Sequence, residues 1–145
     1  MASRKYKYKK PKYRRPMRGA AKTEESKARS MQTSWRFATN RTETLTIDDA
    51  KALIKNPPNC PYCEKPIFWR DFSLDHIIPK SKNGANDHTN LVWTCRICNM
   101  SKGDLTGVEF KLLLNFLNDH PNMKESVLAR LRAGGKAYGR GRRRR

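Results

Sequence analysis

Residues 60–99 read CPYCEKPIFWRDFSLDHIIPKSKNGANDHTNLVWTCRICN. The stretch begins and ends with a Cys-x-x-Cys pair, and all four cysteines of the chain lie in these two pairs. Two residues between thiolates let one tight turn present both sulfur atoms to the same ion, so this spacing favours a tetrahedral Zn²⁺ site. The predicted zinc ligands are Cys60, Cys63, Cys95 and Cys98.

Disulfide bonds or redox-active dithiols are the alternatives to zinc. Neither suits a chain without a secretion signal, and a reactive dithiol would not need a second copy. Because all four predicted ligands belong to the protein, the ion would be structural and would have no open coordination position. Thirty-one residues separate Cys63 from Cys95, so the zinc would hold together the two ends of a long insertion.

The insertion contains two short apolar runs that predict strands. The first comprises residues 67–69 and 72–78, and the second comprises residues 91–94. The separator KSKNGANDHTN is rich in Gly, Asn, Asp and Ser, so it predicts a long loop between the strands. A helix is expected from Asn99 onward.

Helix start signals occur on both sides of this stretch. Thr46 precedes IDDAKALIK with Asp49 three residues later, and Thr106 precedes Glu109 in the same way, as in capping boxes. Outside these, the sequence predicts a helix over 23–37, with Trp35 and Phe37 as its large anchors, and a helix over 123–132, with Asn122 as its cap and Gly134 as its stop.

Asp75 and His76 lie side by side where the first predicted strand ends. Hydrolysis of a phosphodiester needs a base near the attacking water, a divalent cation near the departing oxygen, and positive charges that hold the phosphate. His76 suits the base because its ordinary pKa of about 6.5 leaves the ring mostly neutral at physiological pH. Asp75 offers hard oxygen donors that suit Mg²⁺ or Mn²⁺.

The order DHIIPKSKNG, TNLVW and CRICNMSKGD resembles the HNH endonuclease family. The resemblance covers residues 60–104 and implies a small ββα-metal core. Together with the zinc site, the flanking helices and the disordered basic tails that the rest of the sequence predicts, the expected fold class is α+β. It implies cleavage of DNA, or in some members of RNA, by a single metal centre. Members occur in phage genomes, mobile introns and restriction systems.

The resemblance also assigns roles to individual residues. His76 would be the general base, Asp75 and Asn99 would bind the catalytic metal, and Asn90 would fix the loop so that a backbone carbonyl orients the imidazole. The third signature position is Asn99 rather than His, and an amide oxygen favours Mg²⁺ or Mn²⁺. His88 is a candidate supplementary ligand. Three lysines flank the site and could hold the scissile strand: Lys80, Lys82 and Lys102.

Positive charge is concentrated at the two ends of this 145-residue chain, whose formal net charge is +19. Residues 1–18 hold nine Lys or Arg and no acidic residue, and residues 130–145 hold eight and no acidic residue. The sequence therefore predicts a basic disordered tail at 1–18, a polar linker or helix at 19–44, the HNH nuclease domain at 45–120, a C-terminal helix at 121–134 and a basic tail at 135–145.

Cationic tails of this kind need an anionic partner, and nucleic acid suits them better than a membrane. No apolar stretch approaches the ~20 residues that a spanning helix needs, and no secretion signal is seen, so a cytoplasmic location is expected, in the host if the chain is phage-encoded. Aromatic rings among cations favour stacking on nucleotides. The predicted contacts in the tails are Tyr6, Tyr8, Tyr13, Arg14, Arg15, Arg142, Arg143, Arg144 and Arg145.

Two alternatives and one geometric question remain open at this point. A noncatalytic zinc-stapled nucleic-acid binder explains the cysteines and the tails equally well, and a nuclease of this fold could act mainly on RNA. Neighbouring side chains of a strand point to opposite faces, so Asp75 and His76 reach one phosphate only if the strand ends or twists there.

Overall fold

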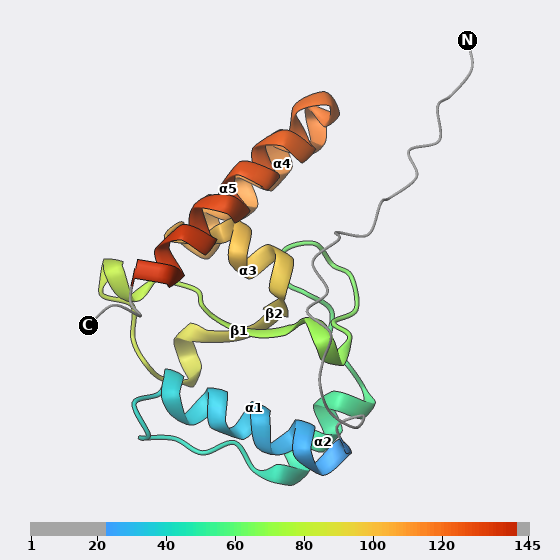
Figure 1. Ribbon diagram of the computed structural model, residues 1–145, viewed down its shortest axis with the longest axis vertical. Coiled ribbons are helices and arrows are strands. Elements are labelled where there is room, and N and C mark those ends of the chain that lie inside the picture. Colours follow the sequence, from blue (N-terminus) through green and yellow to red (C-terminus); the bar gives the residue numbers. More distant parts are fainter. Residues whose placement is uncertain (1–22, 142–145) are drawn as a thin grey trace.

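The computed structural model describes the backbone of residues 23–141 and the side chains of residues 23–134. The predicted contacts of the two tails, from Tyr6 to Arg15 and from Arg142 to Arg145, lie outside the described residues. The fold is α+β, as predicted, with a two-stranded sheet enclosed between helices (Figure 1). No helix within residues 23–141 combines the length and the apolar character needed to cross a membrane.

The sheet consists of β1 (Phe72–His76) and β2 (Leu91–Cys95), which pair antiparallel. The register begins with Phe72 opposite Cys95 and ends with His76 opposite Leu91. Because side chains alternate between faces, Phe72, Leu74 and His76 share one face of β1, while Ser73 and Asp75 share the other. The second strand lies where the sequence predicts it, but the first is confined to 72–76, because Trp69–Asp71 forms a 3-10 turn and residues 67–69 are not part of the strand.

Helices α1 (Glu24–Ala38) and α2 (Ile47–Lys55) cover the face of the sheet that carries His76 (Figure 1). Thr23 and Thr46 cap them, each accepting a hydrogen bond from a backbone N–H three residues later. Trp35 stacks on Trp93 of β2 with ring centroids 6.3 Å apart. Phe37, the other predicted anchor, is 65% exposed and is not part of this core. The prediction was wrong because Phe37 lies on the outer face of α1.

The short helix α3 (Arg96–Lys102) covers the opposite face of the sheet. It begins three residues before the predicted start at Asn99. The physical reason is the cap: the sulfur of Cys95 accepts a hydrogen bond from the Cys98 N–H at 3.4 Å, so the second cysteine pair itself forms the first turn.

Helices α4 (Gly107–Asp119) and α5 (Pro121–Gly141) form a hairpin that projects from the core (Figure 1). Thr106 and Glu109 form the predicted capping box. The prediction that Gly134 stops the last helix was wrong. Pro121 starts α5, a position that suits its fixed φ and missing N–H, and the helix continues through Gly134 into the segment predicted as tail.

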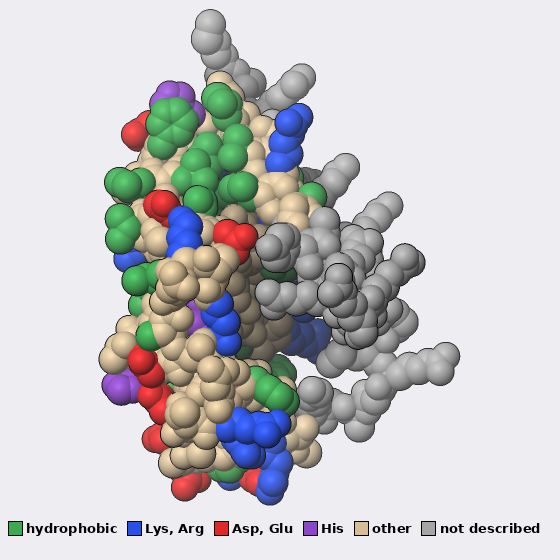
Figure 2. Space-filling model, turned by 90° about the vertical axis from the view of Figure 1, so that its left-hand side faces the viewer, with side chains coloured by type: hydrophobic (Ala, Val, Ile, Leu, Met, Phe, Trp, Pro, Cys, Tyr) green, Lys and Arg blue, Asp and Glu red, His purple; other side chains and the backbone are tan. Residues whose placement is uncertain are grey.

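Apolar side chains cluster on both sides of the sheet and on the hairpin. One core contains Ile67 and Phe110 with the cysteines, and the other contains Ala28, Met31 and Ala50. Figure 2 shows further hydrophobic side chains gathered on the surface over the α4–α5 end of the molecule. The exposed residues of α4 repeat at a spacing of four: Val108, Leu112 and Phe116.

Candidate functional site

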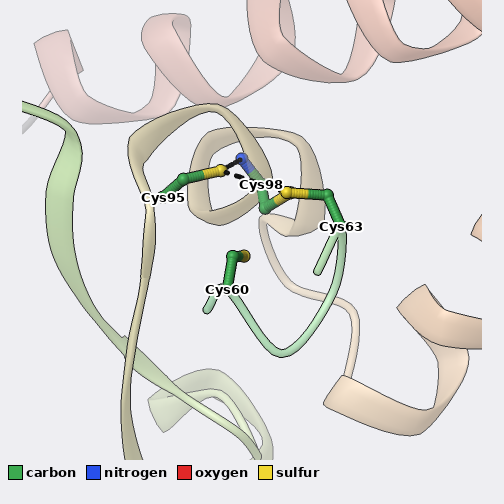
Figure 3. A group of neighbouring side chains, drawn as sticks. All are labelled: Cys60, Cys63, Cys95 and Cys98. Carbon is green, nitrogen blue, oxygen red and sulfur yellow. Dashed lines mark hydrogen bonds between the residues drawn. The ribbon is translucent and has the colours of Figure 1, made fainter. Parts of the chain in front are cut away.

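The four cysteines meet at one point, as their spacing predicts (Figure 3). Their sulfur atoms all lie within 4.8 Å of one another, and those of Cys63 and Cys95 are 3.9 Å apart. A tetrahedral Zn²⁺ with bonds of about 2.3 Å would bring its sulfur ligands about 3.8 Å apart. All four cysteines are free in this arrangement, and the cluster suggests a structural zinc site.

Hydrogen bonding within the cluster separates the pKa values of the thiols. The closeness of Cys95 and Cys98 holds the pKa of the Cys60 thiol well below its ordinary range. The same contact with Cys60 raises the pKa of Cys95 to about 11 and raises that of Cys98 as well. The neighbouring thiols thus stabilise one thiolate, whereas a bound cation would favour the thiolate form of all four cysteines.

Asn90 ties together the loop between the strands. Its amide Oδ1 accepts from the Ile78 N–H at 2.8 Å, and Nδ2 donates to the carbonyls of Ile78 and Ala85, both at 2.9 Å. Gly84 lies so close that an added Cβ would be 1.8 Å from the Ile78 oxygen. Asn90 therefore holds the shape of the loop, and a glycine is required at its closest approach.

His76 lies half-buried at the end of β1, beside the loop. Its Nε2 is 3.1 Å from the Asn86 Oδ1. Burial lowers the pKa of His76, and the positive charge of Lys80 lowers it further, against the opposing effects of Asn86 and of the Ala38 backbone. The ring is thus favoured in its neutral form, with Asn86 and the backbone of Ala38 as its partners, and orientation of the imidazole by a loop carbonyl that Asn90 fixes stays a prediction.

Asp75 is buried on the other face of β1, beneath α3. Its Oδ1 accepts from the Lys102 Nζ at 3.0 Å and its Oδ2 accepts from the Tyr62 hydroxyl at 2.8 Å. Lys102 also donates to the His76 carbonyl at 2.8 Å. Burial raises the pKa of Asp75, and Lys102 acts against this rise.

The structure does not bring the Asp75 carboxylate and the His76 imidazole to one face. Both residues lie inside β1, and the ladder continues to the pair of His76 with Leu91. Asn99 shares the face of Asp75: its Nδ2 donates to the Ser73 Oγ at 2.7 Å and to the Leu74 carbonyl at 3.1 Å. The ladder ends at His76 itself, and strand alternation places the two side chains on opposite faces, so their joint action on one phosphate stays a prediction.

The three lysines predicted to bind the nucleic-acid strand have different environments. Lys102 has a side chain only 1% exposed and is engaged by Asp75, so its predicted contact with nucleic acid is incompatible with this burial. Lys82 pairs on the surface with Glu109 at 2.8 Å. Lys80 is exposed near His76.

His88 lies in the same loop but is engaged by another part of the chain. Its ring Nδ1 and its backbone N–H both contact the carboxylate of Glu43, which precedes α2. This contact raises the pKa of His88 and lowers that of Glu43. In this structure His88 fastens the loop to the α1–α2 connection instead of reaching towards Asp75.

Comparison with known proteins agrees with this arrangement of cysteines, strands and helix. Residues 60–105 match the HNH endonuclease family. Over 46 residues the chain is also 44% identical to the CRISPR-associated endonuclease Cas9 of Corynebacterium diphtheriae. That similarity covers 31% of this chain and only 4% of the Cas9 chain. The HNH match includes both cysteine pairs, the sheet and α3, and the helices on either side lie outside it.

Several polar partners within the HNH segment were missed by the sequence predictions. Tyr62 lies between the first two cysteines, where an aromatic residue is a weak signal for a contact with Asp75. Asn86 lies in a loop rich in Asn and Asp, and nothing in that composition distinguishes it from its neighbours. The ion pair of Lys102 with Asp75 joins residues 27 positions apart, so only the folded chain reveals it.

Proposed function

We propose that this chain is a metal-dependent HNH endonuclease that hydrolyses phosphodiester bonds in DNA, with His76 as the general base. The observation that supports this most directly is the environment of His76 inside the matched segment. Its ring is half-buried, its pKa is lowered, and Asn86 holds one nitrogen. A neutral, oriented imidazole at physiological pH is what a general base requires.

The contact with Asn86 indicates which nitrogen acts. An amide oxygen accepts hydrogen bonds, so Nε2 carries the proton in the neutral ring and donates to the Asn86 Oδ1 at 3.1 Å. The lone pair then lies on Nδ1, which takes the proton of the attacking water. Asn86 is a positioning residue in this proposal, because it acts through the tautomer of His76.

The side chains expected to bind a divalent cation carry the type of donor atom that such a cation prefers. Asp75 and Asn99 offer hard oxygen atoms on one face of the sheet. However, Lys102 and Tyr62 engage both Asp75 oxygens, so a cation would have to share the carboxylate with the ammonium or displace it. A bound Mg²⁺ or Mn²⁺ would supply charge stabilisation at the departing oxygen. The protein's own side chains position the general base and the DNA strand.

The four cysteines are proposed to hold a structural Zn²⁺. Their free thiols and the sulfur separations support this assignment. The site would fasten the loop after α2 to the start of α3, and so set the helix against β1. We propose that residues 45–120 form the nuclease domain around this staple.

A noncatalytic nucleic-acid-binding protein is the second candidate, and one observation favours it. The buried ion pair between Asp75 and Lys102 completes a stable network on the α3 face, and His76 lies on the opposite face. In that case the HNH segment would be a zinc-stapled scaffold. The net charge of +19 is compatible with either candidate.

Cleavage of supercoiled plasmid distinguishes the two candidates. The purified chain is incubated with and without Mg²⁺ or Mn²⁺, beside the variant His76→Ala and the control His120→Ala, whose histidine lies at the end of α4. We expect metal-dependent nicking by the wild type and His120→Ala. His76→Ala should lose activity by a factor of about 10²–10⁴. Equal cutting by both variants, or none by the wild type, refutes the enzymatic proposal, and parallel reactions with RNA identify a nuclease that prefers RNA.

A further inference from the structure

The end of α1 lies against the HNH segment although it is outside the matched residues. The backbone of Ala38, the last residue of α1, contacts the His76 ring. Five residues later, the carboxylate of Glu43 accepts from the backbone and the ring of His88 at 3.0–3.2 Å. The connection from α1 to α2 is therefore fastened to the HNH segment at two points, His76 and His88.

The backbone of this connection adopts an uncommon conformation. Asn40 and Arg41 have φ values of 53° and 68°, and neither is glycine. Such conformations are strained for residues other than glycine and persist only where the surroundings enforce them. Here the Arg41 N–H donates to the Arg36 carbonyl at 2.7 Å, and the fully buried Thr39 donates through its hydroxyl to the Trp35 and Glu43 carbonyls.

This turn carries the Arg41 side chain back over the ring of Phe37. The guanidinium carbon lies 5.8 Å from the ring centroid, within the range of a cation–π contact. Phe37 is 65% exposed, whereas Trp35, two residues earlier, is packed on Trp93. Phe37 directly precedes Ala38, the residue whose backbone contacts His76, so the exposed ring and its cation lie at the same end of α1, on its outer face.

We propose that Phe37 and Arg41 form a nucleotide platform beside the active site, on which one unpaired base of the substrate stacks while its phosphate meets the guanidinium. The proposal rests on the nuclease function proposed above and names its substrate class. A base inside a continuous duplex has both faces covered by its neighbours. The platform therefore favours single-stranded DNA, or a duplex in which one strand is splayed, with the scissile phosphate at His76.

The chemistry of the pair supports this substrate. Stacking of a base on an aromatic ring is independent of sequence, because every base presents a π face. An arginine beside the ring adds a charged donor for phosphate oxygens. Exposed Lys80, on the loop beside His76, would meet the next phosphate along the strand. Exposure of Phe37 alone would not distinguish this site from other surface phenylalanines, but its cation and its place next to Ala38 do.

Binding and cleavage are measured separately on the full chain. Affinity for a fluorescent single-stranded oligonucleotide is measured without divalent cations, at a salt concentration that suppresses non-specific binding. The variants are Phe37→Ala, Phe37→Trp and Arg41→Ala, and the control is Phe68→Ala. Phe68 is 67% exposed, nearly the same as Phe37, but precedes the far end of β1. Iodouracil-substituted oligonucleotides are then photocrosslinked, and the modified residue is mapped.

We expect Phe37→Ala to weaken single-strand binding and raise KM about tenfold, with kcat and the melting temperature unchanged. Phe37→Trp should restore both, Phe68→Ala should match the wild type, and the crosslink should map to residue 37. If Phe37→Ala equals Phe68→Ala in a protein that cleaves DNA, the platform is refuted and the nuclease stands. If the oligonucleotide binds and crosslinks at residue 37 without any cleavage, the nuclease proposal fails and the platform stands.

Discussion

Replacing Lys102 with methionine should destabilise the protein far more than a lysine substitution normally does. The Lys102 and Asp75 side chains are 1% and 6% exposed, and the ammonium also donates to the His76 carbonyl. Methionine preserves much of the apolar stem but leaves Asp75 with only the Tyr62 hydroxyl. Breaking a buried ion pair from one side costs about 3–5 kcal/mol.

A surface lysine provides the matched control. Lys82 pairs with Glu109 at a similar distance, but these side chains are 42% and 48% exposed. Exposed pairs contribute about 1 kcal/mol or less, so Lys82→Met should be nearly neutral. The double variant Asp75→Asn with Lys102→Met removes both charges and should recover part of the loss, since neither partner is left buried and charged.

Guanidinium unfolding of the zinc-loaded chain, followed by circular dichroism, measures these free energies. The deficit of Lys102→Met should shrink as the pH falls. Burial raises the pKa of Asp75, and without Lys102 the carboxyl binds a proton more readily in the folded state than in the unfolded state, so acid relieves the penalty. If Lys102→Met unfolds within about 1 kcal/mol of Lys82→Met, the proposed structural role of the ion pair is wrong.

Three further predictions concern the zinc cluster, the loop and the base. Cys60→Ser should lose the single zinc per chain, measured by atomic absorption, and with it the cooperative unfolding transition; retention of both would contradict a structural role. Asn90→Ala and Gly84→Ala should each destabilise the protein by about 1–3 kcal/mol. Asn90→Ala leaves buried polar groups unpaired, and Gly84→Ala places a Cβ against the Ile78 oxygen. Unfolding curves that match the wild type would count against both. The rate of DNA cleavage should fall only below pH ~6.5, because the pKa of His76 is lowered; Asn86→Asp places a carboxylate beside the ring and should shift this fall to higher pH, and an unmoved profile would exclude the contact.

The fold could be predicted well where the signal is local in the sequence. Paired cysteines, apolar runs and Thr caps each act over a few residues, and they placed the cysteine cluster, β2, most of β1 and the starts of α1, α2 and α4. The predicted start of α3 was three residues too far along the chain, because the Cys95 sulfur caps this helix. The residues normally recognised as N-caps in a sequence are Ser, Thr, Asp and Asn.

The arrangement of the site depends on contacts that no local pattern encodes. The adjacency of Asp75 and His76 suggested a shared site, yet strand alternation sends their side chains to opposite faces. Lys102, the partner of Asp75, is 27 residues away along the chain. The backbone of Ala38, which contacts His76, belongs to α1, and α1 lies outside the HNH match. Long-range packing decides these contacts, so they become visible only in the folded chain.

Helix α3 sets the spacing between the cysteine cluster and the sheet. Cys98 belongs to the cluster, and one turn later Lys102 reaches Asp75. Inserting or deleting a single residue between them would rotate Lys102 by about 100° and turn its ammonium away from the strand. The distance in sequence from the second cysteine pair to Lys102 is therefore fixed by geometry.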